Sequence, residues 1–211
     1  MKWLFSPPSL DDLARLLKAW RFWSVGVLIG GLIGAAAYYV VPPPYRARAT
    51  VLVDFNLEQA WSQETDREQF YYLERETRKL EEIALSDSVL ESIVETNRRN
   101  TVTELRDGRL LLSQPREGGW HFYAVDDDPQ TAAELASEWA RAFAGQVRAQ
   151  AASAQGLNSF IEATVTQAAN LPIGRSVSLG TYLVVGAIGF LALASVLVLF
   201  FDFGQRSAAK E

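Results

Sequence analysis

Cysteine is absent from the 211 residues of this chain, and histidine occurs once, as His121. The lack of cysteine excludes disulfides, thiol nucleophiles and zinc–thiolate sites, and a single histidine excludes histidine clusters. The chain also lacks a phosphate-binding glycine loop with lysine, a G-x-S-x-G elbow and a histidine pair. Acidic residues are plentiful, but no pattern places two of them in one cleft for glycoside hydrolysis. We therefore expect a protein that is not an enzyme and that needs no cofactor or metal.

Positive charge is scarce in the middle of the chain. Residues 42–178 hold 14 Lys and Arg against 21 Asp and Glu, a formal net charge of −7. A nucleic-acid-binding surface needs the opposite balance, so nucleic acid is not an expected partner.

Charged residues are missing altogether from two stretches, 22–41 and 179–201, which are 20 and 23 residues long. A helix rises about 1.5 Å per residue and a hydrocarbon core is about 30 Å thick, so each stretch predicts a transmembrane helix. Three consecutive prolines, residues 42–44, end the first one. A cleaved signal peptide is the alternative for this first stretch, with Ala35, Ala36 and Ala37 as the cleavage site.

Basic residues beside the two stretches predict the orientation of the chain. Six lie near the outer ends, namely Lys2, Arg15, Lys18, Arg21, Arg206 and Lys210, and three lie next to the central segment, namely Arg46, Arg48 and Arg175. This excess predicts tails 1–21 and 202–211 in the cytoplasm. The central segment 42–178 is then periplasmic or extracellular. The amino-terminal tail has the spacing of an amphipathic helix that lies on lipid or docks on a partner.

Glycine recurs every four residues in the first stretch, at Gly26, Gly30 and Gly34. Small residues at this spacing let membrane helices approach closely, so these glycines are candidates for helix packing or oligomer formation. The partner could be the second stretch, another subunit or a different membrane protein. Glycine is also common in membrane helices without such a role.

The central segment has the pattern of an α+β domain. Residues 45–54 predict a strand with one face formed by Tyr45, Ala47, Ala49, Val51 and Val53. A loop over 56–63 then leads into a densely charged helix over 64–84. We expect its apolar face to comprise Phe70, Leu73, Thr77, Leu80 and Ala84, and its charged residues to be solvated.

Two capping-box signals follow, Ser88 with Glu91 and Thr101 with Glu104. The first opens a short helix in which Val89, Ile93 and Val94 face inward. Asp107-Gly108 predicts a turn into a strand at 110–112, and residues 120–125 predict the next strand. The result is a small sheet covered by helices.

The acidic triplet 126–128 precedes Pro129 and a strong helical pattern. Asp128 suits a helix N-cap and Pro129 the first turn, whereas a calcium loop would need ligand spacing and a glycine that are missing. The apolar stripe comprises Ala132, Leu135, Ala136, Trp139, Ala140, Phe143 and Val147. We expect a helical arm over about 129–171, which is either one long helix or a hairpin broken at Gly156. Pro172 and Gly174 end this arm.

Three of these segments resemble one known family, the polysaccharide chain-length determinants, or Wzz-type polysaccharide co-polymerases. They are 42–53, with a proline-terminated helix leading into Tyr45, Ala47, Ala49 and Val51; 85–90, Leu-Ser-Asp-Ser-Val-Leu; and 125–129, Val-Asp-Asp-Asp-Pro, followed by Ala132, Ala133, Ala136, Trp139 and Phe143. The resemblance implies structural roles for eight positions: Pro42, Tyr45, Ala47, Ala49, Asp128, Pro129, Ala133 and Pro172. The chain departs from the family in three respects: Ser137 stands where asparagine is frequent, the proline-rich signature is reduced to Pro172, and the arm is short.

The resemblance implies a non-enzymatic membrane scaffold that forms a homo-oligomer and regulates polymerisation, chain length or export of a cell-surface polysaccharide. O antigen, capsule and exopolysaccharide are all candidates. Its expected partners are itself, membrane lipid, and the polysaccharide polymerase or export machinery. An alternative is an activator of a cytoplasmic tyrosine kinase in the same pathway, as some relatives in this broader family are. A third is a sensor or adaptor for another envelope machine.

Overall fold

The computed structural model describes residues 20–60, 66–97, 100–116, 119–153 and 157–208. The chain divides into two compact units, Met1–Pro43 with Val177–Glu211, and Pro44–Ser176. We call them the helical pair and the central domain. The predicted amphipathic tail falls almost wholly outside the described residues.

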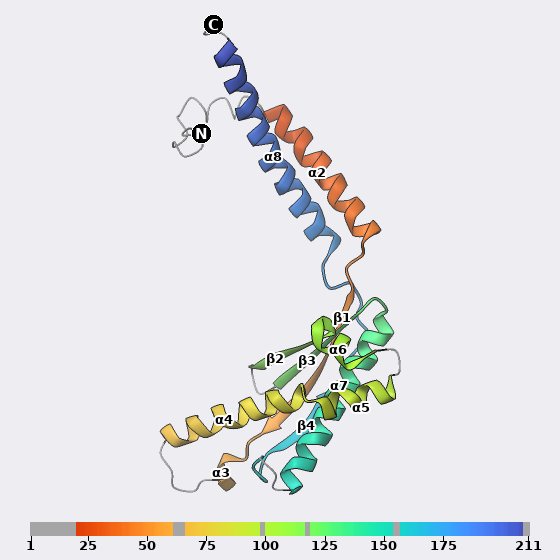
Figure 1. Cartoon of the computed structure of the whole chain (residues 1–211), viewed down its shortest axis with the longest axis vertical. Coiled ribbons are helices and arrows are strands. Elements are labelled where there is room, and N and C mark those ends of the chain that lie inside the picture. The colour runs from red at the N-terminus through yellow and green to blue at the C-terminus, as the bar shows by residue number, and fades with distance from the viewer. Residues whose placement is uncertain (1–19, 61–65, 98–99, 117–118, 154–156, 209–211) are drawn as a thin grey trace. The chain divides into compact units, whose positions relative to one another are not determined.

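The helical pair consists of α2 (Trp20–Val40) and α8 (Leu179–Ala208), which lie side by side (Figure 1). Both helices are long and apolar enough to cross a membrane, over Trp20–Val40 and Leu179–Val198. Their outer surfaces are apolar and exposed, as at Leu28, Leu32 and Val185. α8 continues past the predicted end of the second apolar stretch at residue 201, so the predicted tail is helical up to Ala208.

The central domain is α+β, with one four-stranded antiparallel sheet in the order β2-β3-β1-β4. The strands are β1 (Tyr45–Asp54), β2 (Leu110–Arg116), β3 (Gly119–Asp126) and β4 (Glu162–Gln167). The predicted bounds of β1 are confirmed, and Ala47, Ala49, Val51 and Val53 are buried on one face as expected. α7 (Pro129–Ser153) runs across this face (Figure 1).

The core lies between the sheet and α7. Every residue of the predicted apolar stripe of α7 is fully buried. The ring of Phe122 meets Trp139 edge-on at 4.8 Å between centroids, and Trp120 stacks on Phe143 at 5.9 Å. Trp139 Nε1 also donates a hydrogen bond of 2.8 Å to the carbonyl of Ala84, which satisfies the buried indole and ties the charged helix to α7.

The expected helical arm over 129–171 is wrong beyond α7. Residues 162–167 form β4, which pairs with β1 from Val51↔Val165 to Asp54↔Glu162. A helix here would leave one edge of β1 unpaired, whereas a strand satisfies its backbone groups. The side chains of β4 alternate, with Ala163 buried and Glu162 and Thr164 exposed. Neither the single helix nor the hairpin therefore exists in this part of the chain.

The charged helix, α4 (Asp66–Ala84), buries Leu80 and Ala84 as predicted, but its inward face also includes residues that were not predicted. Phe70, which was predicted to face inward, is 63% exposed, whereas Tyr72 and Glu76 are buried two turns and one turn before Leu80. Glu76 was expected to be solvated, so its burial corrects the interpretation of this charge run. The stretch before α4, predicted as a loop, contains a short helix, α3 (Leu57–Ala60).

The next helix, α5 (Asp87–Thr96), has Ser86 at its N-cap position, without a capping hydrogen bond from the side chain, so the predicted capping box of Ser88 and Glu91 is wrong. Ser88 lies inside the first turn, because the helix starts at Asp87, two residues before the start that a Ser88 cap would require. Val89 and Ile93 are buried as predicted. α6 (Val102–Glu104) and the wide turn η2 (Leu105–Arg109) lead into β2. Gly108 has φ 144°, a conformation that favours glycine, at the predicted turn.

Candidate functional site

The two chain connections of the central domain meet at one end of the sheet. The amide of Ser176 donates a 2.9 Å hydrogen bond to the carbonyl of Pro44, and Tyr45 forms a β-bridge with Arg175. The Arg175 guanidinium lies 4.9 Å from the centroid of the Tyr45 ring, within reach of a cation–π interaction. We call this part of the domain, Pro44–Tyr45 with Arg175–Ser176, the entry end.

The acidic turn that precedes α7 lies at the same end, because Asp126 stands opposite Tyr45 in the β1–β3 register. Asp128 caps α7 as predicted: its carboxylate accepts hydrogen bonds from the amide of Thr131 at 2.7 Å and from the Thr131 hydroxyl at 2.8 Å. Asp126 accepts a hydrogen bond of 3.0 Å from the amide of Asp128, which shapes the turn. Both carboxylates accept hydrogen bonds from backbone amides, as expected of residues at a helix N-terminus.

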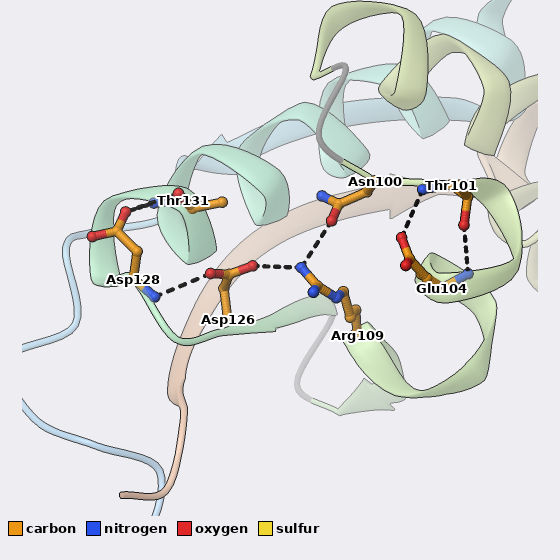
Figure 2. A network of polar contacts seen from close by, with 7 residues as sticks. All are labelled: Asn100, Thr101, Glu104, Arg109, Asp126, Asp128 and Thr131. Carbon is orange, nitrogen blue, oxygen red and sulfur yellow. Dashed lines mark hydrogen bonds and ion pairs between the residues drawn. The ribbon is translucent and has the colours of Figure 1, made fainter.

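Arg109 connects the acidic turn to the loop before α6 (Figure 2). Its Nη1 donates hydrogen bonds to Asp126 at 2.7 Å and to the Asn100 side-chain carbonyl at 2.8 Å. The side chain of Asp126 is only 13% exposed, so its charge needs this partner. The sequence did not point to Arg109 or Asn100 as partners. Arg109 is nine positions from Asn100 and seventeen from Asp126, and no local pattern links residues at these separations.

Thr101 and Glu104 form the predicted capping box beside this bridge (Figure 2). The Thr101 amide donates to the Glu104 carboxylate at 3.0 Å, and the Glu104 amide donates to the Thr101 hydroxyl at 3.3 Å. The hydrogen bond from the Thr101 amide is the main cause that lowers the pKa of Glu104 below its ordinary value of 4.5.

In the helical pair, Gly26, Gly30 and Gly34 are the buried residues of α2, and they face α8. A methyl group on Gly30 would collide with the backbone carbonyl of Gly186, and one on Gly34 with that of Tyr182. On Gly26 it would lie 3.1 Å from Ala194 Cβ. The helices therefore run antiparallel, with backbones in contact at Gly30 and Gly186. We call this contact the glycine seam.

Of the three partners considered for these glycines, the structure places the second apolar helix against them. Gly186 was missed on the other side of the seam. Its signal was present in the sequence, since Gly186 and Ala194 are small residues eight positions apart on the second stretch.

The remaining positions singled out by the family resemblance support packing and chain direction. Pro42 is exposed in the helical pair, and Pro172 is half-buried shortly before Arg175. Ala47 and Ala49 lie under α7, and Ala133 packs on the edge of the core. Ser137 is buried, and its hydroxyl accepts a 3.0 Å hydrogen bond from the amide of Ala169, which fastens the segment after β4 to α7.

Two carboxylates of the central domain are shielded from solvent, Glu138 in part and Glu76 almost completely. Burial is the main cause that raises the pKa of Glu138, and Glu134 adds to it. Glu76 is 1% exposed, and its Oε1 accepts hydrogen bonds from Lys79 at 2.9 Å and from Arg75 at 3.1 Å. They lie on different helices, and over the described ranges no three His, Asp or Glu side chains are grouped closely enough to hold a metal ion. His121 accepts or donates a single 3.2 Å hydrogen bond with Thr50.

Comparison with protein-family models and with curated proteins finds no match to this chain.

Proposed function

We propose that this protein is a non-enzymatic membrane scaffold that regulates polymerisation, chain length or export of a cell-surface polysaccharide. The observation that carries the scaffold part is the closure of the central domain at its entry end. Its two chain connections are joined by the Ser176–Pro44 hydrogen bond, and each continues within a few residues into an apolar helix. A domain closed in this way is suited to being held on one side of a bilayer by two anchors.

The apolar surface of the helical pair supports the membrane assignment. Leu28 and Leu32 on α2 and Val184 and Val185 on α8 are all more than half exposed. Continuous apolar surface of this extent is unfavourable in water and is typical of helices in lipid. The glycine seam agrees with this environment, because close backbone contact is a common way to associate helices where the hydrophobic effect is weak.

The polysaccharide part of the proposal rests on the sequence resemblance. The resembling positions lie in packing and capping roles: Asp128 at the N-cap of α7, Ala47 and Ala49 beneath that helix. Positions of this kind maintain a shape, as a scaffold requires, whereas catalysis would call for reactive groups facing a substrate. The protein would lie in the bacterial plasma membrane with both termini cytoplasmic, assemble with copies of itself, and contact the polymerase or export machinery.

Deletion of the gene in a cell that makes the polysaccharide tests this function. We expect the length distribution or the amount of surface polysaccharide to change on gels, and the wild-type chain to restore it. Gly30→Leu should fail to restore it, because the seam has no room for a side chain, whereas the neighbouring Gly31→Leu should succeed. An unchanged polysaccharide profile after deletion would refute the proposal.

Cross-linking in native membranes, followed by mass spectrometry, tests the partner. The proposal predicts cross-links between copies of this chain and to a polysaccharide polymerase or export protein. Capture of a cytoplasmic tyrosine kinase instead would favour the activator alternative. Capture of an unrelated envelope complex would favour a sensor or adaptor.

A further inference from the structure

A bend just before α8 exposes two large aliphatic side chains. Leu171 is 61% exposed and Ile173 is fully exposed, at 105% of the reference value. Neither belongs to the hydrophobic core of the domain, although Ala169, two residues earlier, still packs against it. We call residues 171–173 the apolar bend. Leu171 and Ile173, which flank the half-buried Pro172, together expose apolar surface outside the core.

The chain itself limits where this bend can lie. Ser176, which is hydrogen-bonded to Pro44, is three residues from Leu179, and Pro44 is four residues from Val40. A residue spans at most about 3.6 Å, so both members of this hydrogen bond lie within roughly 15 Å of the start or end of an apolar helix. Ile173 is six residues from Leu179 and therefore lies within roughly 22 Å of the start of this helix.

The chemistry around the bend fits the boundary between lipid headgroups and hydrocarbon. Arg175 follows the bend and lies over the Tyr45 ring. Arginine beside aromatic rings is frequent at this boundary, because the guanidinium meets phosphate while the ring and the aliphatic stem stay in less polar surroundings. The apolar bend and its neighbours, residues 168–174, contain no charged residue.

We propose that the apolar bend inserts Leu171 and Ile173 into the headgroup boundary of the leaflet that faces the central domain. The bend is then a third membrane contact besides the two helices, and it sets the height and tilt of the domain over the bilayer. This inference rests on the membrane anchoring in the proposed function. It does not depend on the polysaccharide.

Site-directed spin labelling tests the insertion directly, because the chain has no native cysteine to remove. Ile173→Cys is labelled with a nitroxide in the full-length protein and reconstituted into nanodiscs of phosphatidylethanolamine and phosphatidylglycerol. The readout is the ratio of collisions with oxygen, which concentrates in lipid, to collisions with a water-soluble nickel chelate. Two matched sites serve as references: Leu193→Cys on the exposed surface of α8 and Leu111→Cys on β2, where the side chain is 46% exposed.

We expect the ratio at Ile173→Cys to be several-fold higher than at Leu111→Cys and to approach that at Leu193→Cys. A ratio equal to that at Leu111→Cys would place the bend in water and overturn the inference. Low collision rates with both reagents would place it in a protein contact, which also overturns it. If Leu193→Cys itself gave an aqueous ratio, the membrane anchoring would fail, a result distinct from the failure of the bend alone.

Discussion

Single polar side chains at the start of α7 determine how the helix joins the sheet. Asp128 caps the helix. The Asp126 carboxylate accepts hydrogen bonds from the Asp128 amide and from the Arg109 guanidinium. The triplet could be interpreted from sequence as a cap, since Asp followed by Pro is typical of helix N-termini. The bridge from Arg109 to Asn100 could not, because it joins side chains that only the folded sheet brings together.

Asp128→Ala is expected to lower the free energy of unfolding by about 1 kcal/mol, the usual cost of a lost N-cap. The Thr131 amide and hydroxyl both lose their acceptor. Denaturant titration of the full chain in detergent micelles measures the change, with fluorescence of the buried Trp120 and Trp139 as the signal. Asp127→Ala is the matched control, because the Asp127 side chain is exposed. Equal effects of the two substitutions would show that the cap is not the source of stability.

The lowered pKa of Glu104 predicts that the stability contributed by its capping box depends on pH. Its pKa is lowered in the folded protein, so its contribution to stability is present above about pH 4.5 and is lost as the pH falls through the folded value. Glu104→Ala should therefore be less stable than wild type at pH 7, and the difference should shrink below pH 4.5. Unfolding curves at pH 7, 5 and 3.5 test this. A difference that stays constant over this range would exclude the ionised carboxylate as the cause.

The glycine register of the first apolar stretch has a specific partner in α8. Backbone contact at Gly30 and Gly186 leaves no space for a side chain, whereas Gly31 has open space up to a Leu183 methyl group at 3.9 Å. The glycines therefore pair the two apolar helices of one chain. Assembly between chains would have to use other surfaces.

Gly30→Leu should separate α2 from α8. The reporter is a disulfide between Gly26→Cys and Ala194→Cys, because an ideal Cβ at residue 26 lies 3.1 Å from Ala194 Cβ, a few tenths of an ångström short of the distance in disulfides. We expect efficient intramolecular cross-linking in this background and in Gly31→Leu, and little in Gly30→Leu. Cross-linking that survives in Gly30→Leu would contradict the seam. The products are distinguished by mass, since an intermolecular disulfide doubles it.

Residues 162–167 were predicted to be helical but form the strand β4. Helical spacing favoured a helix here, at Leu157, Phe160, Ile161, Thr164 and Ala168. Thr164, Val165 and Thr166 form a β-branched run that favours a strand, and the free edge of β1 decided between the two. A partner strand more than a hundred residues away is invisible to a local pattern.

The proposed membrane topology predicts which sites of the chain a reagent can reach from outside the cell. A single cysteine in place of the exposed Glu91 on α5 should react with a membrane-impermeant maleimide once the outer face of the plasma membrane is reachable. Lys2→Cys should react only after the plasma membrane is opened. Protection of Glu91→Cys, or reaction of both sites in intact spheroplasts, would contradict a central domain outside and termini inside.

Residue order alone was enough for the features that depend on local physics. They include two apolar helices of bilayer length, the bounds of β1, the capping box of Thr101 with Glu104, and the buried stripe of α7. Periodicity, charge and backbone sterics act over a few residues and can be seen in the chain itself. Four features emerged only from the tertiary structure. They are the pairing of β4 with β1, the burial of Glu76, the hydrogen bonds from Arg109 to Asp126 and Asn100, and the contact of the α2 glycines with α8. Each of these depends on which surfaces meet across long separations, and their energies exist only once the domain or the helical pair has formed.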